Sequence, residues 1–398
     1  MTPTKTLTDT RRMKILHTSD WHLGHRLYGH DRTEEQTAMT DRIAEIAREE
    51  KPDVFLLCGD VYDVAQPSAA VQTMFVSALV KIQQAHPEMK IIVTAGNHDS
   101  GSRHEVFRVP WKALGVEMIG TLSLETPELH IVEIPGKGYI IGLPYANERY
   151  IPEGFIQRLL DSVQERNREN LPIVMTAHTT LRGADYKGHE EAGEHIVGGI
   201  EGIDIAMMGR GYDYLALGHI HHDQFVHTGR HNVRYSGSPL AVSFDEDFPH
   251  SVSIVTIDSH GSRPEVRKVA IENPWPLVTL PSSGAANWER AMELLADFPE
   301  KQKAYIRLNI HSDDILPPGA VEEAVHVIKG KLCKFCGINQ KRKFGDHREK
   351  IFTVKEFKAL DPLDIAMQYV EEEGKTFDEE IKEMLGEVME AIKEEDDA

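Results

Sequence analysis

VFLLCGDVYD, residues 54–63, is a short apolar run that ends in a glycine and two aspartates. Its first five residues, Val54 to Cys58, have the length and composition of a strand buried on both faces. Gly59 permits a close backbone approach, and the carboxylate of Asp60 then lies at the end of the strand. Open α/β sheets build their ligand sites at this carboxyl edge. The stretch therefore predicts a layered α/β fold with a site at that rim.

Four further segments place polar side chains where a predicted strand ends. These strands are expected at residues 14–19, 91–95, 173–177 and 214–217. The segments that follow them are Asp20-Trp21-His22, Gly96-Asn97-His98-Asp99, His178 and Gly218-His219-Ile220-His221. One such segment means little, because the chain has 21 histidines and a Gly-Asp pair is usually a turn. Five of them in order at strand ends indicate carboxylate, amide and imidazole ligands for metal ions.

Helical segments separate these strands, as a layered α/β domain requires. Thr33 followed by Gln36 predicts a capping box that opens a helix ending near Glu50. Ser68 is expected to cap a second helix, over 68–84, with an apolar face formed by Val71, Phe75, Leu79 and Ile82. Further strands are expected at 129–134, 139–143, 233–236 and 251–257. They either form a second sheet or continue the first.

Length and composition limit the class of protein. A chain of 398 residues predicts two or three domains. No apolar run approaches the roughly 20 residues that a membrane-spanning helix needs, and the polar first twelve residues do not resemble a secretory signal. We therefore expect no membrane partner. Only three cysteines occur, which favours a reducing compartment such as the cytoplasm.

The formal net charge of -20 weighs against a nucleic-acid partner, because phosphate neutralisation needs Lys and Arg. Half of that excess lies in residues 371–398, which hold 13 acidic residues and 3 lysines. Residues 329–350, by contrast, hold eight basic and two acidic residues. This basic segment either guides a DNA backbone or is an ordinary solvated face. Net charge therefore does not exclude DNA.

The sequence divides into four expected parts. Residues 1–12 read as a disordered leader, and 13–270 as the layered α/β domain. A Pro-rich linker, 272–283, lies at the start of a small α/β module, 271–350, in which strand and helix patterns alternate. The last part, 351–398, is expected to be helical.

Two features of these later parts have either a structural or a functional interpretation. Helices are expected at 361–373 and 377–394, and the apolar stripe of the second either packs within the chain or docks on a partner protein. Cys333-Lys334-Phe335-Cys336 has no second pair of ligands nearby, so it predicts structural cysteines, with a metal or redox role as the minor alternative.

The order D-x-H, GDxxD, GNHD, H and GHxH resembles that of the calcineurin-like metallophosphoesterases. That family's fold is a two-sheet sandwich flanked by helices, which we expect here with a small α/β capping domain and a C-terminal helical tail. Other segments narrow the resemblance to members of the family that cut DNA at double-strand ends and hairpins. They are His17 to Gly24, Thr176 to Thr180, Tyr235 to Pro239 and Ser243 to Asp245.

The resemblance implies two divalent metal ions, Mn²⁺ before Mg²⁺, which support in-line attack on phosphorus. The implied ligands are Asp20, His22, Asp60 and His221 for one ion, and Asp60, Asn97, His178 and His219 for the other. Asp60 bridges the two ions. His98 matches the family's non-ligand histidine, which hydrogen-bonds the phosphate or protonates the leaving oxygen. Asp63 and Asp99 either orient these groups or cap a loop.

The resemblance also implies an activity and partners. The activity is a Mn-dependent 3'–5' exonuclease on double-stranded DNA and an endonuclease on single strands and hairpins, in DNA repair, recombination and replication. The chain has no Gly-x-x-x-x-Gly-Lys-Ser/Thr loop, so any ATP dependence would come from a partner, an SbcC-type ATPase that forms a heterotetramer with it. Homodimerisation through the nuclease domain, in the region of 68–84, is implied as well.

Two alternatives concern the substrate. The same metal site could hydrolyse a small phosphodiester, a nucleotide or a phosphoprotein, and a scaffold without metal is disfavoured because every matched ligand is present.

A loop of aromatic and basic residues after the first motif either contacts DNA or packs around Trp21. Its members are Trp21, His25, Arg26, Tyr28, His30 and Arg32. Arg103 is another expected phosphate contact.

Overall fold

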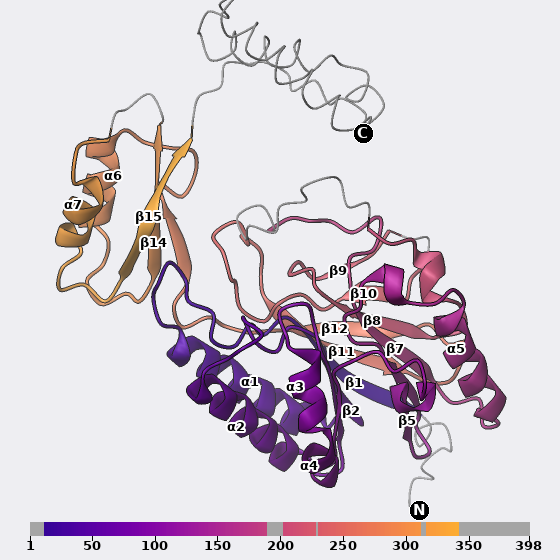
Figure 1. Cartoon of the computed structure of the whole chain (residues 1–398). Coiled ribbons are helices and arrows are strands. Elements are labelled where there is room, and N and C mark those ends of the chain that lie inside the picture. Colours follow the sequence, from indigo (N-terminus) through magenta and orange to yellow (C-terminus); the bar gives the residue numbers. More distant parts are fainter. Residues whose placement is uncertain (1–11, 189–201, 228–229, 312–315, 342–398) are drawn as a thin grey trace, which may run out of the picture. The chain divides into compact units, whose positions relative to one another are not determined.

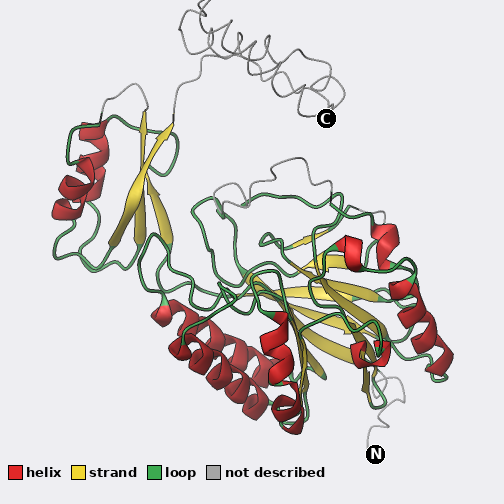
Figure 2. Cartoon of the chain, viewed as in Figure 1, coloured by secondary structure: helices red, strands yellow, loops and turns green. Residues whose placement is uncertain are grey.

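The computed structural model describes residues 12–188, 202–227, 230–311 and 316–341. Two six-stranded sheets lie face to face with helices outside them, and a third, three-stranded sheet follows (Figure 1, Figure 2). The first sheet has the order β12-β11-β1-β2-β3-β4, with β1 to β4 parallel. Its strands are β1 (Met13–Thr18), β2 (Val54–Cys58), β3 (Lys90–Thr94), β4 (Val116–Ile119), β11 (Ser251–Ile257) and β12 (Glu265–Ala270).

The second sheet has the order β5-β6-β7-β8-β10-β9, and β6, β7, β8 and β10 run parallel. Its strands are β5 (Ile131–Ile134), β6 (Gly138–Gly142), β7 (Ile173–His178), β8 (Tyr214–Gly218), β9 (Gln224–Phe225) and β10 (Val233–Tyr235). The expected strand at 129–134 begins instead with a 3-10 turn, η1 (Pro127–His130). The two-sheet sandwich predicted from the sequence is confirmed.

Alternate residues of β2 explain why this strand is apolar throughout. Leu56 and Cys58 face the second sheet, whereas Phe55 and Leu57 pack toward the helices. The strand is therefore buried on both faces, as its sequence predicts. The helices on that side are α1 (Thr33–Glu50), α2 (Ala69–Ala85), α3 (Gly101–Val106) and α4 (Arg108–Ala113) (Figure 1). The helical elements beside the second sheet are η2 (Glu148–Tyr150), α5 (Phe155–Arg166) and η3 (Ile205–Met208).

Of the two predicted helix caps, one is confirmed. Ser68 precedes α2 and accepts a hydrogen bond from a backbone N–H of its first turn at 3.3 Å. The capping box is wrong, because Thr33 is already helical and the N-cap residue is Arg32, with no side-chain cap. Gln36 donates instead to the carbonyl of His22 at 3.1 Å. A tertiary contact with the first motif thus replaces the local cap.

The third sheet forms the small α/β module. It contains β13 (Leu277–Leu280), α6 (Trp288–Ala296), β14 (Tyr305–His311), α7 (Ala320–Val327) and β15 (Lys334–Lys341), with all strand pairs parallel. The alternating pattern is confirmed, but part of the expected linker 272–283 is the edge strand β13. Tyr305 joins the module to the first motif region, since its hydroxyl donates to Glu35 at 2.6 Å and its ring packs with Leu27 and Phe244.

The two cysteines of the module lie in different apolar clusters. Cys333 is buried with the module's own core, and Cys336 packs beside the cluster around Tyr305. Burial raises the pKa of the Cys336 thiol to about 12, and it also raises the pKa of Cys333. Neither thiol is activated, which fits the structural role expected for the pair.

Several sequence-based predictions lie outside the described residues. They are the leader up to residue 11, the basic segment beyond Lys341, the helices at 361–373 and 377–394, and with them the part 351–398. Within the described part of the chain, no helix is both long and apolar enough to span a membrane.

Candidate metal centre

The five motifs meet at one edge of the two sheets. Ligand atoms of Asp20, His22 and His221 all lie within 4.8 Å of one another, and so do those of Asp60, His178 and His219. The amide oxygen of Asn97 lies 2.9 Å from Nε2 of His178 and 3.0 Å from Nδ1 of His219. All seven side chains expected as ligands are therefore brought together. They come from the carboxyl ends of β1, β2, β3, β7 and β8.

The backbone is strained where these side chains are presented. Asp20, His22, Asp60 and His219 have φ values of 54°, 42°, 47° and 101°, a region that residues other than glycine rarely adopt. Four of the seven positive-φ residues other than glycine in the described ranges are thus expected ligands. Strain of this kind persists only where the surrounding structure imposes it, and it gathers at functional sites.

Hydrogen bonds between the loops hold this conformation. The N–H groups of Asp20 and His22 donate to the carbonyls of Gly59 and Asp60, both at 3.1 Å. The carboxylate of Asp99 accepts from three backbone N–H groups, those of Val61, Tyr62 and Gly96, at 2.9 to 3.1 Å. Asp99 thus fixes the loop that carries Asp60.

The first ligand group has a hydrogen-bond pattern that suits a bound cation. Nδ1 of His221 lies 2.9 Å from the carboxylate of Glu246, which only accepts, so this nitrogen carries the hydrogen. Nε2 of His221 therefore keeps its lone pair, and this atom lies 3.2 Å from Nε2 of His22. Two imidazole nitrogens can approach this closely when a proton or another cation lies between them. Neutral histidines next to Asp20 fit a divalent ion.

The second group shows the same pattern. Nδ1 of His178 lies 2.9 Å from the carbonyl of Cys58 and must donate to it. Its Nε2 then faces oxygen acceptors, namely Asn97 Oδ1 at 2.9 Å and Asp60 Oδ2 at 3.2 Å. The same Oδ2 atom lies 3.8 Å from Nε2 of His22 in the first group. Asp60 therefore stands between the two groups.

Electrostatics at the site favours positive charge. Burial acts to lower the pKa of His178, but the carboxylates of Asp60 and Asp20 raise it to about 9. Burial also acts to raise the pKa of Asp60, yet the adjacent His178 and His22 hold it below its ordinary value. Buried carboxylates of this kind need a compensating cation, which divalent metal ions supply.

His98 lies beside the two groups. Its backbone N–H donates to Asp60 Oδ1 at 2.9 Å, and its ring meets that of His22 edge-on with centroids 4.9 Å apart. Nδ1 lies 2.9 Å from the carbonyl of Asp63 and therefore carries a hydrogen. The backbone of Asp63, rather than its carboxylate, orients His98. The carboxylate lies 3.7 Å from Nδ1 of His22.

The expected DNA-contact loop is only partly exposed. Trp21 packs on Phe55, and Arg32 is buried against Tyr305 and donates to a backbone carbonyl, so for these two side chains the structure agrees with the packed-loop alternative. The burial of Arg32 follows from the docking of the small module on this loop, whereas Trp21 belongs to the core between the first sheet and its helices. His30 is likewise directed to the carbonyl of Phe335 at 2.8 Å.

The three residues expected to contact phosphate differ in exposure and charge. Arg26 and Arg103 are exposed, on the first-motif loop and on α3. His25 is half-buried, and burial lowers its pKa to about 4, so it is uncharged near neutral pH. His25 could hydrogen-bond a phosphate but would not neutralise it.

A cavity of about 620 Å³ opens beside Asn97, His178 and His219. One wall is the loop after β6, which contributes Tyr145, Asn147 and Arg149 among others. Sequence reasoning missed this loop. The signal was available, because 143–151 follows the carboxyl end of a parallel strand as the five motifs do, but the loop carries no carboxylate or histidine ligand pattern.

Known proteins resemble the chain over most of its length. The family model described as calcineurin-like phosphoesterase matches residues 13–223. Three similar proteins each carry the name of the SbcD component of the nuclease SbcCD. The one from Rhodobacter capsulatus is 29% identical over 336 residues, which is 76% of this chain and 81% of that protein. Those from Bacillus subtilis and Escherichia coli K12 are 30% and 27% identical, and each alignment covers 76% of this chain and 80% and 79% of theirs.

The matched residues contain the five motifs and both sheets' central strands. The family model covers more than half of the chain, and the Bacillus subtilis protein is 30% identical over four fifths of its own length. The chain belongs to the calcineurin-like phosphoesterase family.

Proposed function

We propose that the protein is a metal-dependent phosphodiesterase that cuts DNA, the nuclease subunit of a complex with an SbcC-type ATPase. The observation that carries the chemistry is the position of Asp60 Oδ2, which lies 3.2 Å from His178 and 3.8 Å from His22. One carboxylate between two ligand groups supports a site for two neighbouring divalent ions. The substrate is proposed from the three relatives, each named as part of a nuclease.

Seven side chains would hold the ions. They are Asp20, His22, Asp60 and His221 for the first ion, and Asp60, Asn97, His178 and His219 for the second. When bound, the ions supply a nucleophile and neutralise charge on the phosphate. Oxygen and imidazole ligands without thiolates suit Mn²⁺ or Mg²⁺, and we propose Mn²⁺.

His98 would act on the substrate phosphate. Its Nδ1 hydrogen is committed to the carbonyl of Asp63, so Nε2 is the atom that exchanges a proton in its acid–base reaction. Protonated Nε2 can hydrogen-bond a phosphate oxygen or protonate the leaving oxygen. Asp63 and Asp99 would position this histidine and Asp60 through the loops described above. Arg26, Arg103 and His25 would contact the DNA backbone.

The alternative substrate is a small phosphodiester or nucleotide. The cavity beside His178 and His219 is large enough for one nucleotide, so geometry alone admits it. The relatives' names favour DNA. We further propose 3'–5' exonuclease and hairpin endonuclease activity, and the cytoplasm as the location.

The test is cleavage of an end-labelled blunt duplex and of a hairpin, in Mn²⁺ and in Mg²⁺, beside bis-p-nitrophenyl phosphate as a small phosphodiester. Asp60→Ala and His98→Leu should lose DNA cleavage by about 100-fold or more while remaining folded. His86→Leu is the matched control, because this half-buried histidine lies between α2 and the amino end of β3, away from the carboxyl rim. Hydrolysis of the small diester with intact DNA would favour the alternative.

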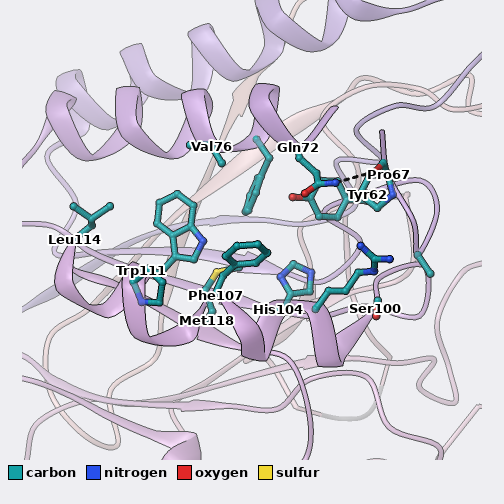
Figure 3. A pocket seen from close by; sticks show the side chains of 14 residues that line it. Tyr62, Pro67, Gln72, Val76, Ser100, His104, Phe107, Trp111, Leu114 and Met118 are labelled. Atoms are coloured by element: carbon teal, nitrogen blue, oxygen red, sulfur yellow. Dashed lines mark hydrogen bonds between the residues drawn. The ribbon is translucent and has the colours of Figure 1, made fainter. Parts of the chain in front are cut away.

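We also propose that two copies associate through α2 and α3–α4. A hollow of about 280 Å³ lies between these helices, and Figure 3 shows the aromatic and aliphatic side chains that line it, Phe107 and Trp111 among them. Val76, Phe107 and Val109 nearby are 44%, 50% and 80% exposed. Exposed apolar surface of this kind is typical of an interface between proteins.

Light scattering after size exclusion tests the dimer. Val109→Asp should give a monomer, because a buried unpaired carboxylate opposes association. Val321→Asp, on the exposed face of α7 and 51% exposed, should leave the dimer intact. A monomeric wild type at micromolar concentration would contradict this part of the proposal.

A further inference from the structure

The segment between β10 and β11 encloses a buried carboxylate that the proposed chemistry does not use. Glu246 is 6% exposed. Its Oε1 accepts from the N–H of Val242 at 3.2 Å, and its Oε2 accepts from the hydroxyl of Ser238 at 3.2 Å. Burying a carboxylate is costly unless its oxygens have hydrogen-bond partners. The loop after β10 provides partners for both oxygens and so holds the Glu246 carboxylate in a fixed position.

The most informative partner is His221. Oε1 of Glu246 lies 2.9 Å from Nδ1 of this histidine, so Nδ1 donates and Nε2 keeps its lone pair. Nε2 is the atom that faces His22 in the first ligand group. A metal-binding histidine commonly donates its other N–H to a carboxylate, which fixes the tautomer and the ring orientation and strengthens the ligand.

The same segment also reaches Asp20. The hydroxyl of Ser236 lies 2.7 Å from that of Ser19, which in turn donates to Asp20 Oδ2 at 2.6 Å. Gly237, which follows Ser236, has φ +76°, and a Cβ there would lie 2.5 Å from the carbonyl oxygen of His221. Only glycine permits this approach. The segment thus contacts His221 directly and Asp20 through Ser19, so it supports two members of the first ligand group.

We infer that Glu246 is a positioning residue for one of the two metal ions, acting through His221, while Ser236 and Ser19 support Asp20 of the same group. The inference rests on the proposed two-metal site and deepens it. Residues 235–239 and 243–245 were singled out in the sequence only by resemblance. The contacts of this stretch with Ser19 and His221 give it a role in holding the first ligand group.

Mn²⁺ binding by the full chain, prepared without metal, tests this inference. Free Mn²⁺ is followed by electron paramagnetic resonance during titration of wild type and Glu246→Gln. The affinity for one ion should fall about 10- to 100-fold, and that for the other should stay unchanged. The amide keeps the shape of the side chain but removes the charge that strengthens His221.

A matched control is Asp213→Asn. Asp213 is also buried, and its carboxylate accepts from a backbone N–H at 2.7 Å and pairs with a histidine nitrogen, His260 Nδ1, at 3.0 Å. It contacts the amino end of β7 at Ile173, opposite the rim. The control should lose stability but keep both Mn²⁺ affinities.

Three results would overturn the inference. They are unchanged affinities in a folded Glu246→Gln protein, an equal loss for both ions, and the same loss in the control. If Glu246→Gln does not fold, Ser238→Ala replaces it, since it removes one donor and leaves the carboxylate. A smaller loss for one ion then supports the inference, and no loss overturns it. A wild type that binds fewer than two ions contradicts the proposed function instead.

Discussion

Gly96 leaves no room for a side chain beside the carboxylate of Asp60. A Cβ at this position would lie 2.0 Å from Asp60 Oδ1 and 2.3 Å from the backbone nitrogen of Asp60. Real Cβ contacts essentially never fall below 3.0 Å, so Gly96→Ala must move Asp60 by about 1 Å. Misplacement of a catalytic group by about 1 Å costs about 100-fold in rate, or about 2.7 kcal/mol of transition-state stabilisation. We expect kcat on DNA to fall by at least that factor.

The assay compares Mn²⁺-dependent cleavage rates and thermal unfolding of Gly96→Ala and Gly261→Ala. Gly261 has φ +83° and open space around its Cβ position, so its substitution should cost about 1–2 kcal/mol of stability and leave the rate unchanged. Gly96→Ala should lose about 1–3 kcal/mol from overpacking as well as its activity. A Gly96→Ala enzyme that is folded and within threefold of the wild-type rate would refute the reasoning.

Three further predictions concern stability and thiol chemistry. Asp99→Ala leaves three loop N–H groups without their acceptor and should cost about 2–4 kcal/mol in denaturant unfolding, with weaker Mn²⁺ binding; a loss below about 0.5 kcal/mol would contradict it. Burial lowers the pKa of His17 to about 3. The unfolded chain therefore takes up a proton at His17 below pH 6.5, whereas the native chain does not. This histidine should lower the free energy of unfolding by about 1.4 kcal/mol per pH unit between pH 6.5 and pH 3, measured with chelator present. His17→Gln should flatten this slope. Burial raises the pKa of Cys58 and that of Cys336, so Ellman's reagent at about pH 8 should label these thiols only after unfolding; rapid labelling of the native protein would disprove this.

The sequence predicted the two sheets and the rim because both depend on local patterns. A strand such as Val54 to Cys58 is apolar on both faces only when layers cover both, and the polar residue that follows it must lie at the sheet edge. The expected ligands Asp20, Asp60 and His219 are therefore recognisable in the sequence as polar residues at the ends of apolar runs. Their proximity across about 200 residues follows from parallel strand order.

Contacts between distant segments could not be predicted in this way. Gln36 fits a local capping rule, but it binds the carbonyl of His22 once α1 packs under the first motif. Arg32 looks like a DNA contact until the small module buries it beside Tyr305. Glu246 has no distinctive spacing in the sequence, and only the path of the chain after β10 brings it to His221.

The central claim is that five strand ends build a site for two divalent ions that Asp60 joins. Anomalous diffraction from crystals grown with Mn²⁺ tests it most directly. We predict two peaks, one among Asp20, His22 and His221 and one among Asn97, His178 and His219, with Asp60 touching both. A single peak, or two peaks of which Asp60 touches only one, would contradict the account.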